Sequence, residues 1–149
     1  MFAAYVGRCS NKVKNIVERG AVKKFAEAIG DPHPIYWDEE TGKKSRYQMN
    51  IAPPTFPRVF DYGIIEGLNL PNKGLIHGEQ QFHYERPLFV GEEVFCYSKI
   101  ESYYEKQSSM GKLGLLVVKN YGEDEEGNVI FTSSSTIIIT EAVRKAMAL

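Results

Sequence analysis

Hydrophobic residues recur at spacings of three and four between residues 19 and 29, at Val22, Phe25, Ala26 and Ile29. This spacing predicts a helix with one buried stripe. Gly30 ends the helix, because glycine tolerates the left-handed conformation that closes helices and Asp31-Pro32 does not easily continue one. The stretch GDPHPIYWDEE, residues 30–40, is therefore predicted to be a loop, within which Asp38 caps a second, short helix.

A wider hydrophobic pattern follows in IAPPTFPRVFDYGIIEGLNLPNKG, residues 51–74. Its prolines permit a helix only from the first turn onward. After them, a broad apolar face forms from Phe56, Val59, Phe60, Ile64 and Leu68. We predict a long buried helix from about Thr55 to Leu68, in which Gly63 and Gly67 let the backbone approach a sheet closely.

The second half of the chain has the composition of strands. Four segments rich in Val, Ile, Tyr, Phe and Thr cover residues 75–86, 92–106, 112–122 and 128–140. They are separated by PLFVGEE, QSSMG and GEDEEGN, and they predict an antiparallel meander. With a short strand around residues 12–18, the layout is α+β: an antiparallel sheet of about five strands wrapped around the long central helix.

Composition narrows the class of protein. A chain of 149 residues supports one core and is too short for two ordinary domains, so we expect a single domain over residues 1–149. Its 18 basic and 19 acidic residues predict neither nucleic acid nor an anionic membrane as a partner. No apolar run reaches membrane-spanning length. Cys9 and Cys96 form no metal-ligand spacing and suit a reducing compartment, so we expect a cytoplasmic location.

Five polar residues alternate along the first of the long strand segments: His77, Glu79, Gln81, His83 and Glu85. Alternation predicts that all five lie on one face of the strand. Such a row is a possible metal site, but same-face neighbours about 6.5 Å apart converge poorly on one ion without ligands from other strands. We therefore expect a solvated face, with no metal and no cofactor.

The predicted loop at residues 30–40 holds a carboxylate, an imidazole and a phenol within six residues, at Asp31, His33 and Tyr36. Residues of this kind after a helix end often serve only as turn formers, since Asp side chains bond nearby backbone and proline fixes the bend. The same three groups are also the parts of an acid/base site. The residues alone leave both interpretations open.

Several segments in a fixed order carry a resemblance: FAEAIGDPHPIYWDEE, NIAPPTF, LPNKGLIHGEQQFHYERPLFVGEEV and the final strand pair. Together they resemble the MaoC-like family of (R)-specific hydratases and hydroxyacyl-thioester dehydratases, and most closely its N-terminal-type hotdog domain. The resemblance implies a hotdog fold, with the segment from Thr55 to Leu68 as its central helix. It also implies that two such domains pair and that an acyl tunnel follows the pairing interface.

Catalytic members of that family contain a motif of the form D-x-N-P-x-H. An H-G pair follows it at the start of the central helix. Asp31 and Pro34 match this pattern, whereas His33 stands in place of Asn and Tyr36 in place of the catalytic His. A phenol with a reference pKa near 10 is a poor base at neutral pH. Pro53 and Pro54 align with the H-G pair, and proline has no backbone N–H to offer an oxyanion.

These two departures imply a non-catalytic subunit that pairs with a catalytic MaoC-like hotdog chain and shapes the pocket for an acyl-CoA or acyl-ACP thioester. The candidate pocket residues are Pro54, Thr55, Phe56, Val59, Phe60 and Tyr62. A homodimeric hydratase that uses Asp31 and His33 is the first alternative, and a thioester-binding or regulatory protein without turnover is the second. In isolation the chain is expected to form a homodimer through its sheet edges and central helices.

Overall fold

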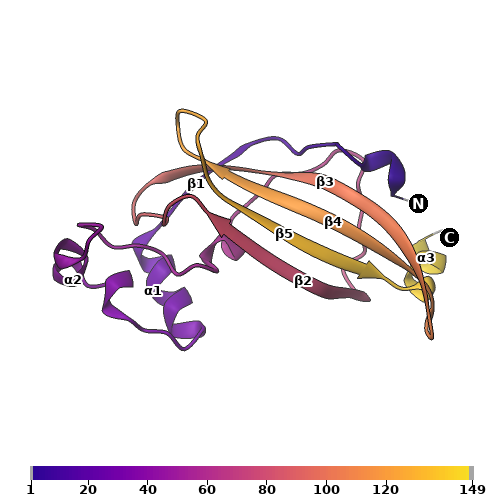
Figure 1. Ribbon diagram of the computed structural model, residues 1–149, viewed down its shortest axis with the longest axis horizontal. Coiled ribbons are helices and arrows are strands. Elements are labelled where there is room, and N and C mark those ends of the chain that lie inside the picture. The colour runs from indigo at the N-terminus through magenta and orange to yellow at the C-terminus, as the bar shows by residue number, and fades with distance from the viewer. Residues whose placement is uncertain (1, 148–149) are drawn as a thin grey trace.

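The computed structural model describes residues 2–147 and contains a curved antiparallel sheet, with the two N-terminal α-helices at one end and the C-terminal helix at the other (Figure 1). The five strands are β1 (Val13–Ile16), β2 (Leu75–Tyr84), β3 (Glu93–Ser108), β4 (Gly111–Glu123) and β5 (Val129–Ile139). All pairings are antiparallel, and the order across the sheet is β1-β3-β4-β5-β2. The α+β class is confirmed, and the long strands begin and end within two residues of the predicted limits.

The prediction that all four long strands form one meander was wrong for β2. Strands β3, β4 and β5 do form a meander, but β2 pairs with β5, so that Phe82 lies opposite Ser133. The segment between β2 and β3 is not a hairpin turn, because it is tied to other parts of the chain. Ala52 N donates to Leu88 O at 2.9 Å, and Gly91 N donates to Val17 O at 2.7 Å. These bonds hold the segment beside the end of β1, and β3 begins there.

The two helices expected near the N-terminus are present. Helix α1 (Arg19–Ala28) is followed by Gly30 with a φ of 73°. Helix α2 (Glu39–Lys44) is capped by Asp38, whose carboxylate accepts the amide N–H of Thr41 at 3.1 Å. The remaining helical elements are the short turns η1 (Ala3–Tyr5), η2 (Pro34–Tyr36) and η3 (Phe56–Val59), and the C-terminal helix α3 (Glu141–Met147), which we did not predict.

The long central helix predicted from Thr55 to Leu68 was wrong. Only η3 is helical there, and residues 60–74 cross the concave face of the sheet without forming a helix. Gly63 and Gly67 adopt φ values of 77° and 79°, which a right-handed helix does not contain. The amide that a helix would bond internally goes elsewhere: Ile64 N donates to the side-chain oxygen of Asn11 at 3.0 Å.

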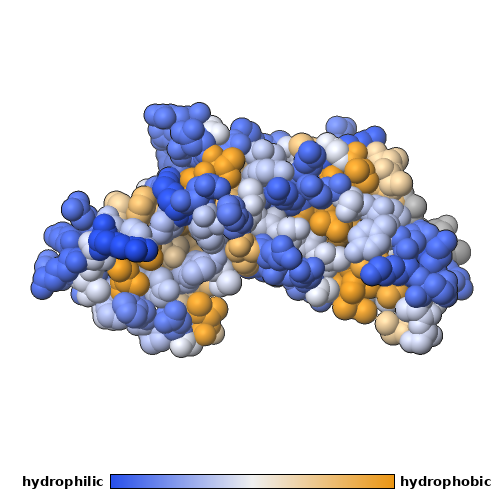
Figure 2. All heavy atoms as spheres, viewed as in Figure 1, coloured by the Kyte–Doolittle hydropathy of each residue, from blue (hydrophilic) through white to orange (hydrophobic). Residues whose placement is uncertain are grey.

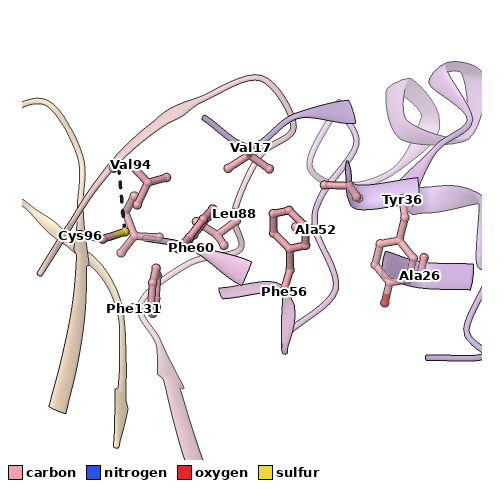
Figure 3. Close-up of a cluster of buried hydrophobic side chains, with 12 residues drawn as sticks. Val17, Ala26, Tyr36, Ala52, Phe56, Phe60, Leu88, Val94, Cys96 and Phe131 are labelled. Atoms are coloured by element: carbon pink, nitrogen blue, oxygen red, sulfur yellow. Dashed lines mark hydrogen bonds between the residues drawn. The ribbon is translucent and has the colours of Figure 1, made fainter. Parts of the chain in front are cut away.

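The apolar residues of this segment nevertheless form the core. Phe56 and Phe60 belong to a buried cluster that runs from Tyr36 and Ala26 beside the helices to Phe131 on the sheet (Figure 3). A second buried cluster, at the other end of the sheet, consists of Phe2, Ile65, Ile100, Leu116 and Ile139. The hydrophobic pattern therefore identified Phe56 and Phe60 as buried, but Val59 and Ile64 of the predicted apolar face are 54% and 78% exposed, because the backbone there is not a helix.

Candidate functional site

An apolar groove of about 390 Å³ brings together the two positions at which the chain departs from the catalytic pattern. Tyr36 from η2 and Pro54, just before η3, both line it. The other lining residues are Tyr47, Ile51, Ala52, Tyr84, Glu85, Arg86 and Pro87. Residues 36 and 54 are thus parts of one site, although eighteen positions separate them in the chain.

Tyr36 is the buried member of the loop trio, with 8% of its surface exposed. Its hydroxyl donates to Asp31 Oδ2 at 3.3 Å. Burial raises the pKa of the Tyr36 phenol, and the negative charge of Asp31 and the hydrogen bond to it raise this pKa further. Tyr36 is therefore a neutral hydrogen-bond donor at physiological pH, and less of it is deprotonated and able to act as a base than of a free phenol.

Asp31 and His33 are exposed and have local structural roles. The amide of Asp31 donates to Ala26 O at 2.9 Å, which closes the end of α1. The ring nitrogen Nδ1 of His33 accepts the amide N–H of Ile35 at 3.0 Å and so caps η2. Of the three loop residues, Tyr36 alone lines the groove. His33 is turned to its own backbone, as a turn-forming residue would be.

The wall of the groove around Pro54 offers few backbone donors. Two nearby amides are used internally, since Ala52 N donates to Leu88 O and Phe56 N donates to Pro53 O, both at 2.9 Å. Pro54 contributes a carbonyl instead, which accepts the hydroxyl proton of Tyr84 at 2.6 Å. At the position where an oxyanion donor is expected, the wall therefore presents proline and an acceptor that is already occupied.

The remaining predicted pocket residues divide between core and surface. Phe56, Phe60 and Tyr62 follow one another through edge-on ring contacts, with centroid separations of 5.5 Å and 6.5 Å. Thr55 is exposed, and Val59 is 54% exposed. A separate groove of about 420 Å³ beside β1 is lined by Val59 together with parts of Phe56 and Phe60. Tyr62 donates its hydroxyl to Pro57 O at 2.6 Å and holds the turn around η3.

A further apolar groove, of about 340 Å³, lies where the central helix was expected. It runs between residues 63–70 and the concave face of the sheet and is lined by Ile64, Ile65, Leu68, Leu70, Ile100, Val118 and Ile137, with Gly63 and Ser98. This groove was not predicted, because those residues were expected to pack as a helix. The alternating apolar residues of β3, β4 and β5 were the available signal.

The row of polar residues on β2 is not on one face throughout. The strand register shifts between His77 and Glu79, so that His77 lies opposite Ile137 while Glu79 lies opposite Thr136. His77 consequently shares the face of Leu75, and only the residues after Gly78 follow the predicted face. Within residues 2–147, no three His, Cys, Asp or Glu side chains are grouped closely enough to hold a metal ion.

The surface of the protein is mixed in character. On the face seen in Figure 2, hydrophilic residues surround several separate hydrophobic patches. None of the helices between residues 2 and 147 has both the length and the apolar character that crossing a membrane requires.

Phenols buried in the groove and in the turn around η3 predict a loss of stability at alkaline pH. Burial raises the pKa of Tyr84 and Tyr62 strongly, and that of Tyr36 to a lesser extent. The unfolded chain therefore releases these protons first, near the reference pKa of about 10. Burial also raises the pKa of the Cys96 thiol, to about 12, so the unfolded chain releases that proton from about pH 8.5. We expect the free energy of unfolding to fall gradually above about pH 8.5 and more steeply above about pH 10.

Urea unfolding at a series of pH values measures this loss. Tyr84→Phe should make the fall less steep, whereas Tyr104→Phe, at a residue with 43% of its surface exposed, should leave it unchanged. An equal slope for both variants would contradict the prediction.

Comparison with known proteins places the chain in a family. The family model described as FAS1-like, dehydratase domain region, matches residues 4–133. A UPF0336 protein from Streptomyces avermitilis is 32% identical over 132 residues, which are 85% of this chain and 85% of that protein. A UPF0336 protein from Parafrankia is 30% identical over 142 residues, which are 90% of this chain and 91% of that protein.

Solved structures share the fold at lower identity. The 3R-hydroxyacyl-ACP dehydratase complex HadBC from Mycobacterium tuberculosis contains a chain with a TM-score of 0.70 and 20% identity, covering 90% of this chain and 96% of that chain. The ChsH1-ChsH2 complex from the same organism contains a chain with a TM-score of 0.74 and 18% identity. That match covers 89% of this chain and 84% of the other. An (R)-hydratase from A. caviae has a TM-score of 0.67 and 19% identity, and the match covers 90% of this chain and 96% of the other.

These neighbours confirm the hotdog fold. The chain belongs to the family of the FAS1-like dehydratase domain region.

Proposed function

We propose that this chain, as one hotdog domain, is the non-catalytic subunit of a (3R)-hydroxyacyl-thioester dehydratase or enoyl-thioester hydratase. The observation that carries the proposal is the groove in which Tyr36 and Pro54 lie together. The reaction needs a base for proton transfer, an acid/base partner for the oxygen at the β-carbon, and donors for an enolate-like oxygen. Only the carboxylate of Asp31 survives from that set, and it is hydrogen-bonded to a phenol.

A partner with an intact D-x-N-P-x-H loop and H-G pair would supply the missing groups. Some structural neighbours are two-protein complexes, HadBC and ChsH1-ChsH2, and this supports such an arrangement. In the proposed complex this chain contributes apolar wall to the acyl pocket. Pro54 and Tyr84 at the first groove and the concave-face groove under residues 63–70 are the surfaces available for an acyl-CoA or acyl-ACP chain.

The proposal predicts that the purified chain alone is nearly inactive. Loss of the base costs about 10²–10⁴ in rate, and loss of one oxyanion donor costs about 10²–10³. We expect hydration of crotonyl-CoA and longer enoyl thioesters to be at least about 10⁴-fold slower with this chain alone than with a complex containing an intact MaoC-like partner. The measurement is the initial rate of both preparations at equal concentration.

A self-sufficient homodimeric hydratase is the second candidate, because Asp31 still contacts a hydroxyl that lines the groove. Enzyme-like rates for the chain alone, abolished by Asp31→Ala, would establish it and defeat the first proposal. His33→Ala tests whether His33 takes part, since the first proposal predicts no effect of this change on the complex. Acyl-thioester binding without turnover, even when intact MaoC-like partners are supplied, would instead indicate a binding or regulatory protein.

A further inference from the structure

Two lysines on the convex face of the sheet lie directly opposite each other. Lys99 of β3 pairs in register with Lys119 of β4, and both side chains are half-buried. They project from the face opposite to Ile100 and Val118, because successive side chains of a strand alternate between the two faces. Like charges at directly opposed positions of neighbouring strands destabilise a sheet, so this lysine pair costs stability unless an anion balances it.

Carboxylates of the chain do not neutralise the lysine pair. Within residues 2–147, neither Lys99 nor Lys119 takes part in an ion pair. Lys112 on the same strand β4, by contrast, has its Nζ atom 2.8 Å from Glu105 Oε2. The sheet therefore leaves two positive charges uncompensated at one place on its convex face.

A hollow of about 380 Å³ on the same face lies beside Lys119. It crosses three strands, since Lys119 of β4 pairs with Ser134 of β5, and Ser134 pairs with Gln81 of β2. Its wall includes Lys119, Thr132, Ser134, Gln81, His83 and Glu101. One ammonium, two hydroxyls, an amide and an imidazole are thus gathered around one space, and each of these groups is able to donate hydrogen bonds.

Two tyrosines hold the ammonium of Lys119 beside the hollow. Lys119 Nζ lies 5.3 Å from the centroid of the Tyr121 ring, and a cation above an aromatic face is attracted to it. The Tyr121 ring stacks in turn on the ring of Tyr97 from β3, with centroids 4.8 Å apart and planes inclined by 7°. This support restricts the lysine side chain, which lowers the entropy that binding a ligand costs.

The spacing of the donors suits a phosphate or diphosphate group. Strands β4 and β2 are two strand spacings apart, or about 9.5 Å, so the donors follow a line across the sheet. Phosphate oxygens accept charge-assisted hydrogen bonds from ammonium and hydroxyl groups, and a diphosphate presents such oxygens along its length. A carboxylate has two oxygens on one carbon and reaches only one end of the line.

We propose that this hollow is an anion site for a small molecule that carries a diphosphate or phosphate group. The ammonium of Lys119 contacts the phosphate, the hydroxyls of Thr132 and Ser134 donate to its oxygens, and Lys99 supplies the second positive charge. The site shares no lining residue with the groove on which the proposed function rests, so it is independent of that function.

Glu101 limits the affinity of the site. A bulge between Ile100 and Ser102 takes Glu101 out of the strand ladder, and Glu101 lines the hollow. A carboxylate repels an anion at short range, so Glu101→Gln should lower the dissociation constant by about threefold. An unchanged or raised dissociation constant in this variant would place the anion elsewhere and overturn the proposal.

Calorimetric titration at low ionic strength with inorganic pyrophosphate and, separately, inorganic phosphate tests the site directly. We expect saturable binding of pyrophosphate with a dissociation constant of about 0.1–1 mM, and weaker binding of phosphate, because hydrogen bonds to charged groups are few and exposed here. Lys119→Ala should raise the dissociation constant at least about tenfold, and Lys99→Ala by about threefold. No saturable binding of either anion up to about 20 mM would overturn the proposal.

The matched control is Lys112→Ala, which removes the same charge from the same strand away from the hollow. Its dissociation constant should stay within about twofold of the wild-type value. A loss equal to that of Lys119→Ala would show a nonspecific effect of net charge and overturn the proposal.

Urea unfolding with and without pyrophosphate shows that the variants are folded and gives a second readout. A ligand that binds only the native state raises the unfolding midpoint. Pyrophosphate should therefore raise the midpoint of the wild-type chain and of Lys112→Ala, and should leave that of Lys119→Ala unchanged. An equal rise in all three proteins would overturn the proposal. Turnover enters neither readout, so the outcome is separate from the test of the proposed function.

Discussion

Phe56→Ala should lower the free energy of unfolding by about 3–5 kcal/mol, which is the range for removing a buried aromatic ring. Phe56 is 1% exposed and makes edge-on contacts with Phe25 and Phe60, both with centroids 5.5 Å apart. It thereby joins α1 to η3 in the main core (Figure 3). The free energy of unfolding of an ordinary domain is only about 5–15 kcal/mol, so this substitution removes a large part of the stability.

Urea unfolding at neutral pH measures this loss. The matched control is Val59→Ala in the same turn. Because Val59 is 54% exposed, this substitution should change the free energy of unfolding by no more than about 0.5 kcal/mol. If Phe56→Ala does not fold, Phe56→Leu supplies the comparison, because it keeps part of the apolar volume. A loss below about 1 kcal/mol for Phe56→Ala would mean that residues 56–60 are not the packed core described above.

Tyr36→His combined with Pro54→Gly should raise the hydration rate of the isolated chain by about 10²-fold or more. The first change places an imidazole in the groove beside Asp31, whose carboxylate now lies 3.3 Å from the Tyr36 hydroxyl. The second provides a backbone N–H in the groove wall and keeps the carbonyl that accepts the Tyr84 hydroxyl. Each single change should have little effect, since a base without an oxyanion donor, or the reverse, leaves the reaction incomplete.

A double-mutant cycle of initial rates with crotonyl-CoA measures this coupling. Adding Asp31→Ala to the double variant should abolish the gain, which distinguishes a rebuilt site from a contaminating hydratase. If the double variant folds and remains as slow as the wild-type chain, the two substitutions at positions 36 and 54 do not account for the missing activity.

The helix at α1, the capped start of α2 and the limits of the long strands were predictable because their signals are local. Apolar spacing, a side-chain cap and β-branched composition each act within a few residues. No such local signal determined the backbone conformation of the central segment, residues 55–68. Its apolar residues fit a helix equally well, but Gly63 adopts a left-handed conformation and Asn11 accepts the amide of Ile64, and Asn11 lies more than fifty residues away in the chain.

The candidate site shows the same division. The unusual residues at positions 36 and 54 were visible in the sequence, as was the absence of an N–H at proline. Their meeting in one groove was not, because it depends on the contact of η2 with the segment before η3 and on Tyr84 from β2. Likewise, the row of polar residues on β2 was evident, but the register shift at Gly78 decides which of them share a face.

By itself the sequence determined the composition of the core near α1 and the long strands, where those local elements begin and end, and which groups of a hydratase site are replaced, because caps and strand limits follow from residue type and short-range spacing. Only the tertiary structure decided that the central segment is extended, that β2 pairs with β5 and leaves its other edge free, and that Tyr36 and Pro54 line one groove. Those outcomes depend on hydrogen bonds between residues far apart in the chain, and local patterns do not encode them.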